Sequence, residues 1–580
     1  MAGSTLFLRR VAGRARRELA YLTIRRDLAR WRRESRGLRS ARPRAADEGV
    51  ALIISLSDFV FSLKLEAMIA TALRLAGYRV VVLTLPNARW ARAYLGAAGV
   101  EEFVTPVEDI PADLVAEARA AAAAAHAANP GVQELKDFEY RGAYVGQQAI
   151  STLSRTFERG RISFDDKDVR AALAKLLPEA VQSTVAADLL LDRVRPGLVV
   201  FNEKGYAGYG SIYDLALRRG ANVVQFVAAG IHTRDALLFK RYTLETRRIH
   251  PASLSRDSWE KARALPWTPQ REAALEREFA VRYDSGEKHP DAGLQEGKEL
   301  KGAEDVRRQL GLDPAKPTAI VFSHVLWDAN LFYGDDLFAD QETWLVETVK
   351  AACANPAANW VIKLHPANMY KARAGELNDE TAIREAIGEL PPHVKLLHPQ
   401  TDINTYSLFA VADAAVTIRG TIGMEVPCFG VPVLTAGTGR YSGLGFTIDS
   451  ATPEEYLDRL ACIQELPRLD DAAVLLAKRH AYALFRLRAF VFSSYRASFA
   501  SAARLAHPLS HNLRLTRRTQ AQVEGAPDLR ELGEWLADPS LLDYLASPMS
   551  SSCGAREARR AGASGAAAAG GPSTPAAPRP

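Results

Sequence analysis

Apolar runs that alternate with helical stretches restrict the fold of this 580-residue sequence more than any other feature. In the first half of the chain, the expected strands are apolar along their whole length and are separated by helix-length segments. Such strands are typical of a parallel sheet that helices cover on both faces. The expected strands are 51–57, 78–85, 197–202 and 222–228, and the clearest helices are 61–77 and 211–220.

The same alternation returns later in the chain, so the sequence predicts a second doubly wound α/β domain. Its expected strands are 318–324, 360–366, 394–399, 414–418 and 431–437. A chain of this length also needs more than one ordinary domain.

The rest of the chain differs in composition from these two regions. The end of the chain is rich in Ala, Gly, Ser and Pro, cannot build a core, and is predicted to be disordered. A helix over 470–500 is expected to pack back across the domains. We divide the chain into an arginine-rich arm (1–48), a first α/β domain (49–283), a linker (284–305), a second α/β domain (306–465), a helical extension (466–545) and a tail (546–580).

The arm carries most of the positive charge of the protein. Arg9 to Arg44 contains 14 arginines and three acidic residues, whereas the formal net charge of the whole chain is +6. Apolar residues from Leu8 to Trp31 recur at near-helical spacing, which predicts an amphipathic helix on a membrane surface. A solvated helix that packs on the body is the alternative. Nucleic-acid binding is disfavoured, because aromatic residues are sparse and no recognised motif follows.

Cysteine use and hydropathy favour the cytoplasm. The four cysteines lie far apart without a CxxC pair, which argues against a disulfide framework and a thiolate zinc site. The sequence shows neither a secretory signal nor an apolar run long enough to cross a membrane.

Three expected strand ends of the second domain carry polar residues. One ends on Lys363, His365 and Pro366, where an imidazole could donate to a phosphate or serve a structural role. Another ends at His324, and Asp328 follows it as a cleft residue or a turn cap. Ligands of such sheets bind at the carboxyl ends of strands, so the segment from Lys316 to Asp449 is predicted to bind a nucleotide phosphate.

The third strand end is followed by small residues at an expected helix start. Gly420, Thr421 and Gly423 would let backbone N–H groups approach a phosphate, and the helix dipole favours its charge. Glu425, one turn later, is placed to accept from ribose hydroxyls; a plain turn that Thr421 caps is the alternative. Neither a Walker loop nor a GxGxxG fingerprint is present.

The runs 322–334, 363–368 and 401–447 resemble the capsule-polysaccharide biosynthesis family, which includes bacterial Kdo transferases of the GT-B fold. The resemblance extends more loosely over 201–230. It implies two Rossmann-like domains that face an interdomain cleft, with a helical C-terminal extension. The His-Pro pair and the helix start are also similar to those of CMP-sugar sialyltransferases and CDP-glycerol polymer transferases. That similarity implies that the donor is held by His365, Pro366, Gly420, Thr421 and Glu425. Sialyltransferase-like enzymes usually have two adjacent hydroxyl residues where this chain has Gly420-Thr421, a departure that weakens the case for CMP.

The resemblance implies a glycosyltransferase that moves a sugar from a nucleotide donor, CMP-Kdo-like, to a glycan or glycolipid acceptor, without a separate cofactor. We expect a cytoplasmic protein, peripheral at the inner membrane through Arg9 to Arg44, that binds no nucleic acid. A CDP-alditol phosphotransferase, a UDP-sugar transferase or epimerase, and an inactive assembly scaffold are the alternatives.

The first domain should supply the base that accepts the proton of the acceptor hydroxyl. Asp58 and Glu203 are the leading candidates, and His232 and Asp235 are further ones. The resemblance favours Asp58, whereas the glycine-rich loop at 205–210 raises Glu203 to equal rank. Each could instead cap a helix or form a loop salt bridge.

A metal site is not expected, because no DxD pair lies at a strand end, and Asp335-Asp336 is expected to be an exposed turn. Lys363 and Arg419 are the available cations, and with His324 they complete the predicted donor site.

Overall fold

The computed structural model describes most of the chain. The residues outside the description are 1, 43–47, 128–130, 231–234, 285–296, 329–330, 367, 369–377, 500–506 and 547–580, and for 2–17, 284 and 378 only the backbone is described. The candidate base His232, most of the predicted linker and nearly all of the predicted tail lie outside the described residues.

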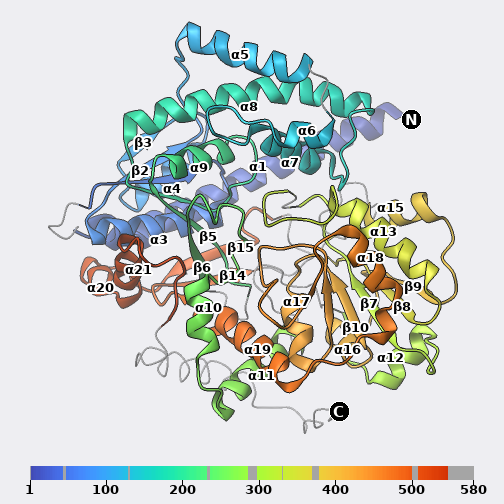
Figure 1. Ribbon diagram of the computed structural model, residues 1–580. Helices are drawn as coiled ribbons and strands as arrows, with labels where there is room; N and C mark the ends of the chain where they lie inside the picture. The colour runs from blue at the N-terminus through green and yellow to red at the C-terminus, as the bar shows by residue number, and fades with distance from the viewer. Residues whose placement is uncertain are drawn as a thin grey trace.

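The first domain is built on a seven-stranded sheet with the order β13-β6-β5-β4-β1-β2-β3 (Figure 1). β1 pairs in parallel with β2 and β4, whereas β6 runs antiparallel to β5. The strands are β1 (Val50–Ser55), β2 (Arg79–Thr84), β3 (Glu102–Val104), β4 (Leu198–Phe201), β5 (Asn222–Ala228), β6 (Ala236–Tyr242) and β13 (Phe490–Val491). The four strands predicted from the sequence are confirmed, and the antiparallel edge was not predicted.

Helices cover both faces of this sheet, and a helical insertion enlarges the first domain. Between β3 and β4 the chain forms helices α5 to α8, of which α5 and α8 lie along the top of Figure 1. The helices are α1 (Ala2–Glu34), α2 (Arg36–Ser40), α3 (Val60–Ala76), α4 (Arg89–Ala97), α5 (Ala112–Ala127), α6 (Val132–Lys136), α7 (Val145–Phe157), α8 (Lys167–Val194), α9 (Tyr209–Arg218), α10 (Arg256–Arg263) and α11 (Pro269–Asp284).

The second domain has a six-stranded sheet with the order β12-β11-β10-β7-β8-β9, parallel throughout. All five strands predicted for this domain are confirmed. The strands are β7 (Thr318–Phe322), β8 (Asn359–Lys363), β9 (Val394–Leu397), β10 (Ala414–Thr417), β11 (Val433–Thr435) and β12 (Ile448–Asp449). The helices are α12 (Ala303–Leu310), α13 (Gln341–Ala354), α15 (Asn378–Ile387), α16 (Thr405–Phe409), α17 (Ile422–Glu425) and α18 (Pro453–Ala461), with 3-10 turns at Val426–Phe429 and Ile463–Glu465.

After the second domain, the chain returns to the first. α19 (Asp471–Tyr482) contacts α10, α11 and α17, and a π-helical turn (Ala483–Leu487) ends it. The predicted helix over 470–500 is therefore too long: from Phe490 the chain adds β13 to the first sheet, because β6 offers an antiparallel partner edge. β14 (Tyr495–Phe499), β15 (His511–Leu515), α20 (Gln520–Glu524) and α21 (Pro527–Ala537) follow.

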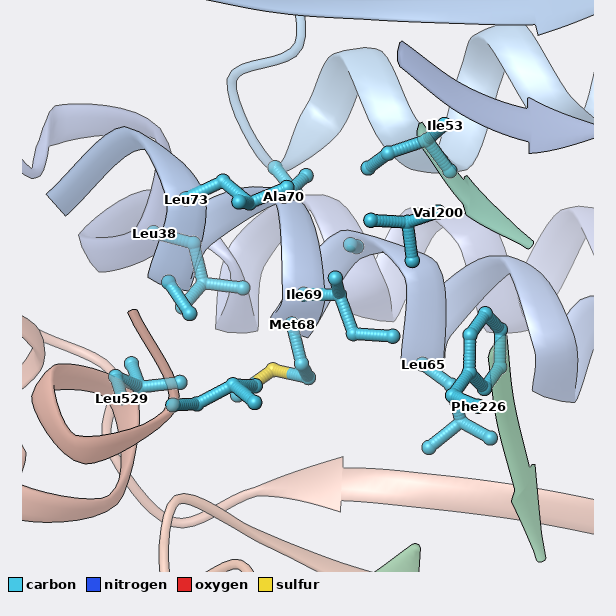
Figure 2. Packing of buried hydrophobic residues seen from close by; sticks show 14 of the residues in the cluster. Leu38, Ile53, Leu65, Met68, Ile69, Ala70, Leu73, Val200, Phe226 and Leu529 are labelled. Carbon is cyan, nitrogen blue, oxygen red and sulfur yellow. The ribbon is translucent and has the colours of Figure 1, made fainter. Parts of the chain in front are cut away.

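Helix α3 lies at the centre of the first core (Figure 2). Ile69 and Leu65 lie among side chains that project from β1, β4 and β5, and Met68 lies beside Leu529 of α21. The helix ends at Gly77, whose φ of 105° places it in the left-handed region that favours glycine. One helix thus connects the sheet to the C-terminal extension.

The arginine-rich segment forms helix α1, and its second half packs on the body. Trp31 is buried and its indole N–H donates to the carbonyl of Tyr94 over 2.9 Å, while Leu28 is also buried. The apolar stripe was predicted to face a membrane; from Tyr21 to Trp31, much of it instead covers α4. Leu19 and Leu22 remain 65% and 47% exposed. Among the described residues, no helix is both long and apolar enough to span a bilayer.

Candidate functional site

Both sheets reverse their strand order at a defined point. In the second domain, β7 lies between β8 and β10. β8 and β9 follow on one side of β7, and β10, β11 and β12 follow on the other. Ligands of doubly wound sheets bind outside the carboxyl ends of the strands at this switch point. The three strand ends singled out in the sequence belong to β7, β8 and β10, so they lie side by side at this position.

His324, which follows β7, contacts the end of β10 directly. Its Nε2 lies 3.0 Å from the Thr417 hydroxyl and accepts the backbone N–H of Ile418 at 3.3 Å. Burial, together with the nearby guanidinium groups of Arg419 and Arg440, lowers the pKa of His324 to about 3. The imidazole is therefore neutral at physiological pH and carries its proton on Nδ1.

The turn after β10 presents backbone donors at the same place. Gly420 is packed so closely that a Cβ there would lie 3.1 Å from the Thr417 hydroxyl and 3.2 Å from the His324 ring. The N–H groups of Thr421 and Ile422 have no hydrogen-bond partner among the described residues. α17 has only four residues before the 3-10 turn, so its dipole is small. An anion at this turn would therefore be held more by these two N–H donors than by the helix dipole.

Arg440 and Tyr441 complete this turn, and sequence reasoning missed both as site residues. The Tyr441 hydroxyl donates to the carbonyl of Gly420 over 2.7 Å, and Arg440 donates to the carbonyl of Arg419 over 3.2 Å. Arg440 is only partly buried and forms no ion pair with a described residue. The GTGRYSG run was visible in the sequence, but only the fold brings it onto the β10 turn.

The end of β8 is connected to β7 through Asp379, a third residue that sequence reasoning missed. Its carboxylate accepts from the Ser323 hydroxyl at 2.8 Å and from the His365 backbone N–H at 3.4 Å. Asp379 is fully buried, and burial raises the pKa of its carboxyl group. His365 therefore lies beside the His324 strand end, and the buried Pro366 follows it.

Three of the predicted donor ligands are buried, and two of these form ion pairs. Glu425 is fully buried and pairs with Arg282 at 2.8 Å, so it does not face an open ribose site. Arg419 is 6% exposed and forms an ion pair with Asp336, so neither is free. Lys363 is 6% exposed, and burial lowers its pKa to about 7.

The two candidate bases of the first domain differ in their surroundings. Asp58 follows β1, is exposed, and accepts the backbone N–H of Ala91 at 3.1 Å, in the first turn of α4. Glu203 follows β4 and accepts the N–H groups of Lys204 and Gly205, and its second oxygen lies 3.9 Å from Arg155. Burial raises the pKa of Glu203. Asp58 thus caps a helix, which was its alternative role.

The Glu203 loop is also where the two domains meet. The Tyr206 hydroxyl donates to Asp328 of the second domain over 3.4 Å. A Cβ at Gly205 would lie 2.1 Å from the ring of Phe332, so the backbone of the loop touches the second domain. Asp235, the remaining candidate, accepts the N–H of Ala497 and holds β14 in place. The Glu203 loop therefore contacts the second domain directly.

Residues 295–478 match the model of the capsule polysaccharide biosynthesis protein family. The second domain is similar to this family. The match contains every residue predicted to hold the donor, from His324 to Glu425, and neither Asp58 nor Glu203. A comparison with curated proteins finds no significant match.

Solved structures similar to this chain include a Kdo transferase and a UDP-GlcNAc 2-epimerase. A KpsC β-Kdo 2,4-transferase of Thermosulfurimonas dismutans is 15% identical over 49% of this chain and 79% of its own, with a TM-score of 0.30. The UDP-GlcNAc 2-epimerase of Neisseria meningitidis, bound to UDP-GlcNAc, is 13% identical over 75% of this chain and 96% of its own, with a TM-score of 0.25. These scores are low, so the similarity to the capsule family rests on the sequence match and on the motifs within it.

Proposed function

We propose that the protein is a glycosyltransferase of surface or capsular polysaccharide synthesis that uses a nucleotide sugar, with a CMP-linked, Kdo-like donor favoured. The observation that carries the proposal is the assembly at the switch point of the capsule-family domain. There His324, the Thr421–Ile422 donors and Arg440 converge from separate segments of the chain. The Kdo transferase among the similar structures is consistent with this donor.

The donor phosphate would bind at the turn after β10. The N–H groups of Thr421 and Ile422 supply uncharged donors, and Arg440 supplies a cation that forms no ion pair with a described acid. Charge-assisted hydrogen bonds of this kind stabilise a leaving phosphate without a metal ion. His324 would hold its neighbours in place, because its Nε2 is engaged by Ile418.

Glu203 is the proposed general base. Its carboxylate lies on the loop that contacts the second domain, and a raised pKa brings a glutamate nearer to neutrality, where base catalysis is most efficient. The glycan or glycolipid acceptor would then approach from the first domain, and the sugar would move across the interdomain contact.

We further propose that the protein acts at the cytoplasmic face of the inner membrane as a peripheral protein. Helix α1 supports this proposal, because it exposes Leu19 and Leu22 among arginines. A lipid-linked acceptor would then be held near the enzyme by the same surface.

Thermal denaturation in the presence of CMP, CDP, UDP and GDP tests the proposed donor class. Stabilisation by CMP above the other three supports the CMP-linked donor. Selective stabilisation by UDP would indicate a UDP-sugar transferase or epimerase, and selectivity for CDP an alditol phosphotransferase. Stabilisation by none of the four would contradict the proposal and favour an assembly scaffold.

A further inference from the structure

A hollow lined by arginines lies between α1 and β15, far in sequence from the proposed donor site. Its volume is about 410 Å³, and Arg30, Arg33, Glu34, Arg514 and Arg518 line it. Four arginines face one glutamate, so the hollow carries an excess of positive charge. We call these five residues the arginine hollow.

The backbone and Glu34 hold the two sides of the arginine hollow together. Glu34 accepts from Arg514 at 3.0 Å and lies 3.7 Å from Arg518. The backbone N–H of Gly37 donates to the carbonyl of Arg518 over 3.0 Å. A Cβ at Gly37 would lie 2.5 Å from that oxygen, so the close approach depends on glycine. These contacts hold α2 and the end of α1 beside Arg514 and Arg518.

A buried ion pair holds helix α1 about one turn before Arg30. Asp27 of α1 pairs with Lys64 of α3 at 2.7 Å, and both side chains are almost fully buried. Asn512 of β15 donates to the other Asp27 oxygen over 3.2 Å. α1 is thus held against both α3 and β15, and the arginine hollow lies on a rigid part of the body.

Two of the four arginines lack a protein anion. Arg30 and Arg33 are exposed, and neither forms an ion pair with a described residue. Guanidinium groups bind phosphate oxygens through paired hydrogen bonds, which makes a cluster of this kind suited to a phosphate. The single carboxylate is already shared by Arg514 and Arg518.

The position of Arg30 and Arg33 on α1 indicates where that phosphate comes from. Leu19, Leu22, Arg26, Arg30 and Arg33 lie on one face of the helix by its 3.6-residue period. Leu19 and Leu22 are 65% and 47% exposed. Exposed apolar side chains beside arginines are typical of helices that lie in a membrane interface.

We propose that the arginine hollow binds the phosphate of an anionic phospholipid headgroup, while Leu19 and Leu22 enter the acyl boundary. This inference rests on the proposed peripheral membrane association and names its lipid site. Binding there would fix the orientation of the first domain on the membrane, since α1 is held by α3 and β15.

Vesicle co-sedimentation of the full chain tests the site. The vesicles contain phosphatidylcholine alone or with phosphatidylglycerol, and the proteins are wild type, Arg30→Gln/Arg33→Gln and Arg25→Gln/Arg32→Gln. The second pair is a matched control: both arginines are exposed on α1, but lie off the face that carries Leu19 and Leu22. The hollow variant should lose about tenfold or more in affinity for the anionic vesicles. The control should lose about threefold or less, although it removes the same charge.

Equal losses in the two variants would overturn the lipid site and leave only diffuse attraction between the arm and the membrane. Displacement of the protein from vesicles by inorganic phosphate or glycerol 3-phosphate at low concentration would also overturn it, because the ligand would then be a soluble phosphate. A wild-type protein that ignores anionic vesicles would contradict the membrane association itself. Thermal stabilisation by CMP, measured on the same proteins, reports separately on the proposed donor site.

Discussion

Glu203 and Asp58 follow neighbouring strands, but Glu203 lies on a loop that reaches the second domain, whereas Asp58 caps α4. We expect Glu203→Gln to lower kcat by about 10²–10⁴-fold, because the variant cannot accept the acceptor proton. Asp58→Asn keeps an oxygen that can accept the N–H of Ala91 and should change kcat only a few-fold.

Steady-state kinetics of both variants check this expectation, and unchanged stabilisation by nucleotide shows that the donor site is intact. Because burial raises the pKa of Glu203, the acid limb of the wild-type pH–kcat profile should lie above the range of an ordinary glutamate. The acid limb should be absent from the residual activity of Glu203→Gln. Loss of activity in Asp58→Asn but not in Glu203→Gln would contradict this assignment and indicate that Asp58 is the base.

Glu66 makes stability depend on pH. Burial raises its pKa to about 8, against 4.5 for a free glutamate, and its carboxyl group lies 2.5 Å from the Ser55 hydroxyl. The folded state thus retains a proton that the unfolded state releases between these two values. Stability should therefore fall as pH rises through this window.

Chemical denaturation from pH 5 to pH 8 checks this dependence. In Glu66→Gln, the decline should be shallower by roughly 1 kcal/mol per pH unit. The exposed Glu101→Gln is the control and should follow the wild type. Parallel curves for wild type and Glu66→Gln would show that Glu66 ionises freely in the folded protein.

Residue patterns found part of the candidate site. His324 and Gly420 follow continuous apolar strands, so the sequence alone placed them at strand ends. Arg440 and Asp379 could not be found this way, because they reach the site through a loop and a helix start whose positions depend on tertiary packing. The ion pair of Arg419 with Asp336 and that of Glu425 with Arg282 also join distant segments.

At the scale of elements, α21 stabilises the first domain by packing on α3 (Figure 2). Leu529 is fully buried in this contact. Leu529→Ala should lower the free energy of unfolding by about 2–5 kcal/mol, through lost burial and the cavity left behind. Denaturant titration measures the loss, and the half-exposed Leu541→Ala should cost much less. Equal losses would mean that the α21–α3 contact contributes little.

The central strands were predictable because a strand buried on both faces is apolar along its whole length. The segment after Leu487 was not, since its apolar residues suit a helix as well as a strand. β13 forms there because β6 leaves an edge to which Phe490 and Val491 add. A long-range pairing of this kind decides the local structure.

At the scale of the whole molecule, the C-terminal extension is fastened to the first sheet by buried charges. Asp543 pairs with Lys240 at 2.9 Å and with Arg488 at 3.3 Å, and all three side chains are buried. Burial alone would raise the pKa of Asp543, but Arg488 and Lys240 lower it overall. Asp543→Ala should reduce the free energy of unfolding by about 3–5 kcal/mol, because it leaves two buried cations without an anion.

Thermal and denaturant unfolding of Asp543→Ala test this fastening, with the exposed Asp538→Ala as a control on the same segment. A loss no larger than that of the control would show that the extension is held by apolar packing instead.

The two α/β sheets could be predicted from the sequence, but the contacts between the two domains could not. Two doubly wound sheets are encoded in strand composition, which is local. The Gly205–Phe332 and Tyr206–Asp328 contacts depend on how loops from both domains meet. The catalytic proposal concerns this interface, and the donor proposal concerns the second domain alone.

Calorimetric titration with CMP and with cytidine tests the donor site most directly, on wild type, Arg440→Gln and Arg308→Gln. Arg308 is an exposed arginine of α12, which precedes β7 and so lies toward the opposite end of the sheet. Arg440→Gln should weaken CMP binding by about 10–100-fold, the value of a charge-assisted hydrogen bond, and leave cytidine binding unchanged. Arg308→Gln should match the wild type for both ligands. Unaltered CMP affinity in Arg440→Gln would contradict the placement of the phosphate at the switch point of the second sheet.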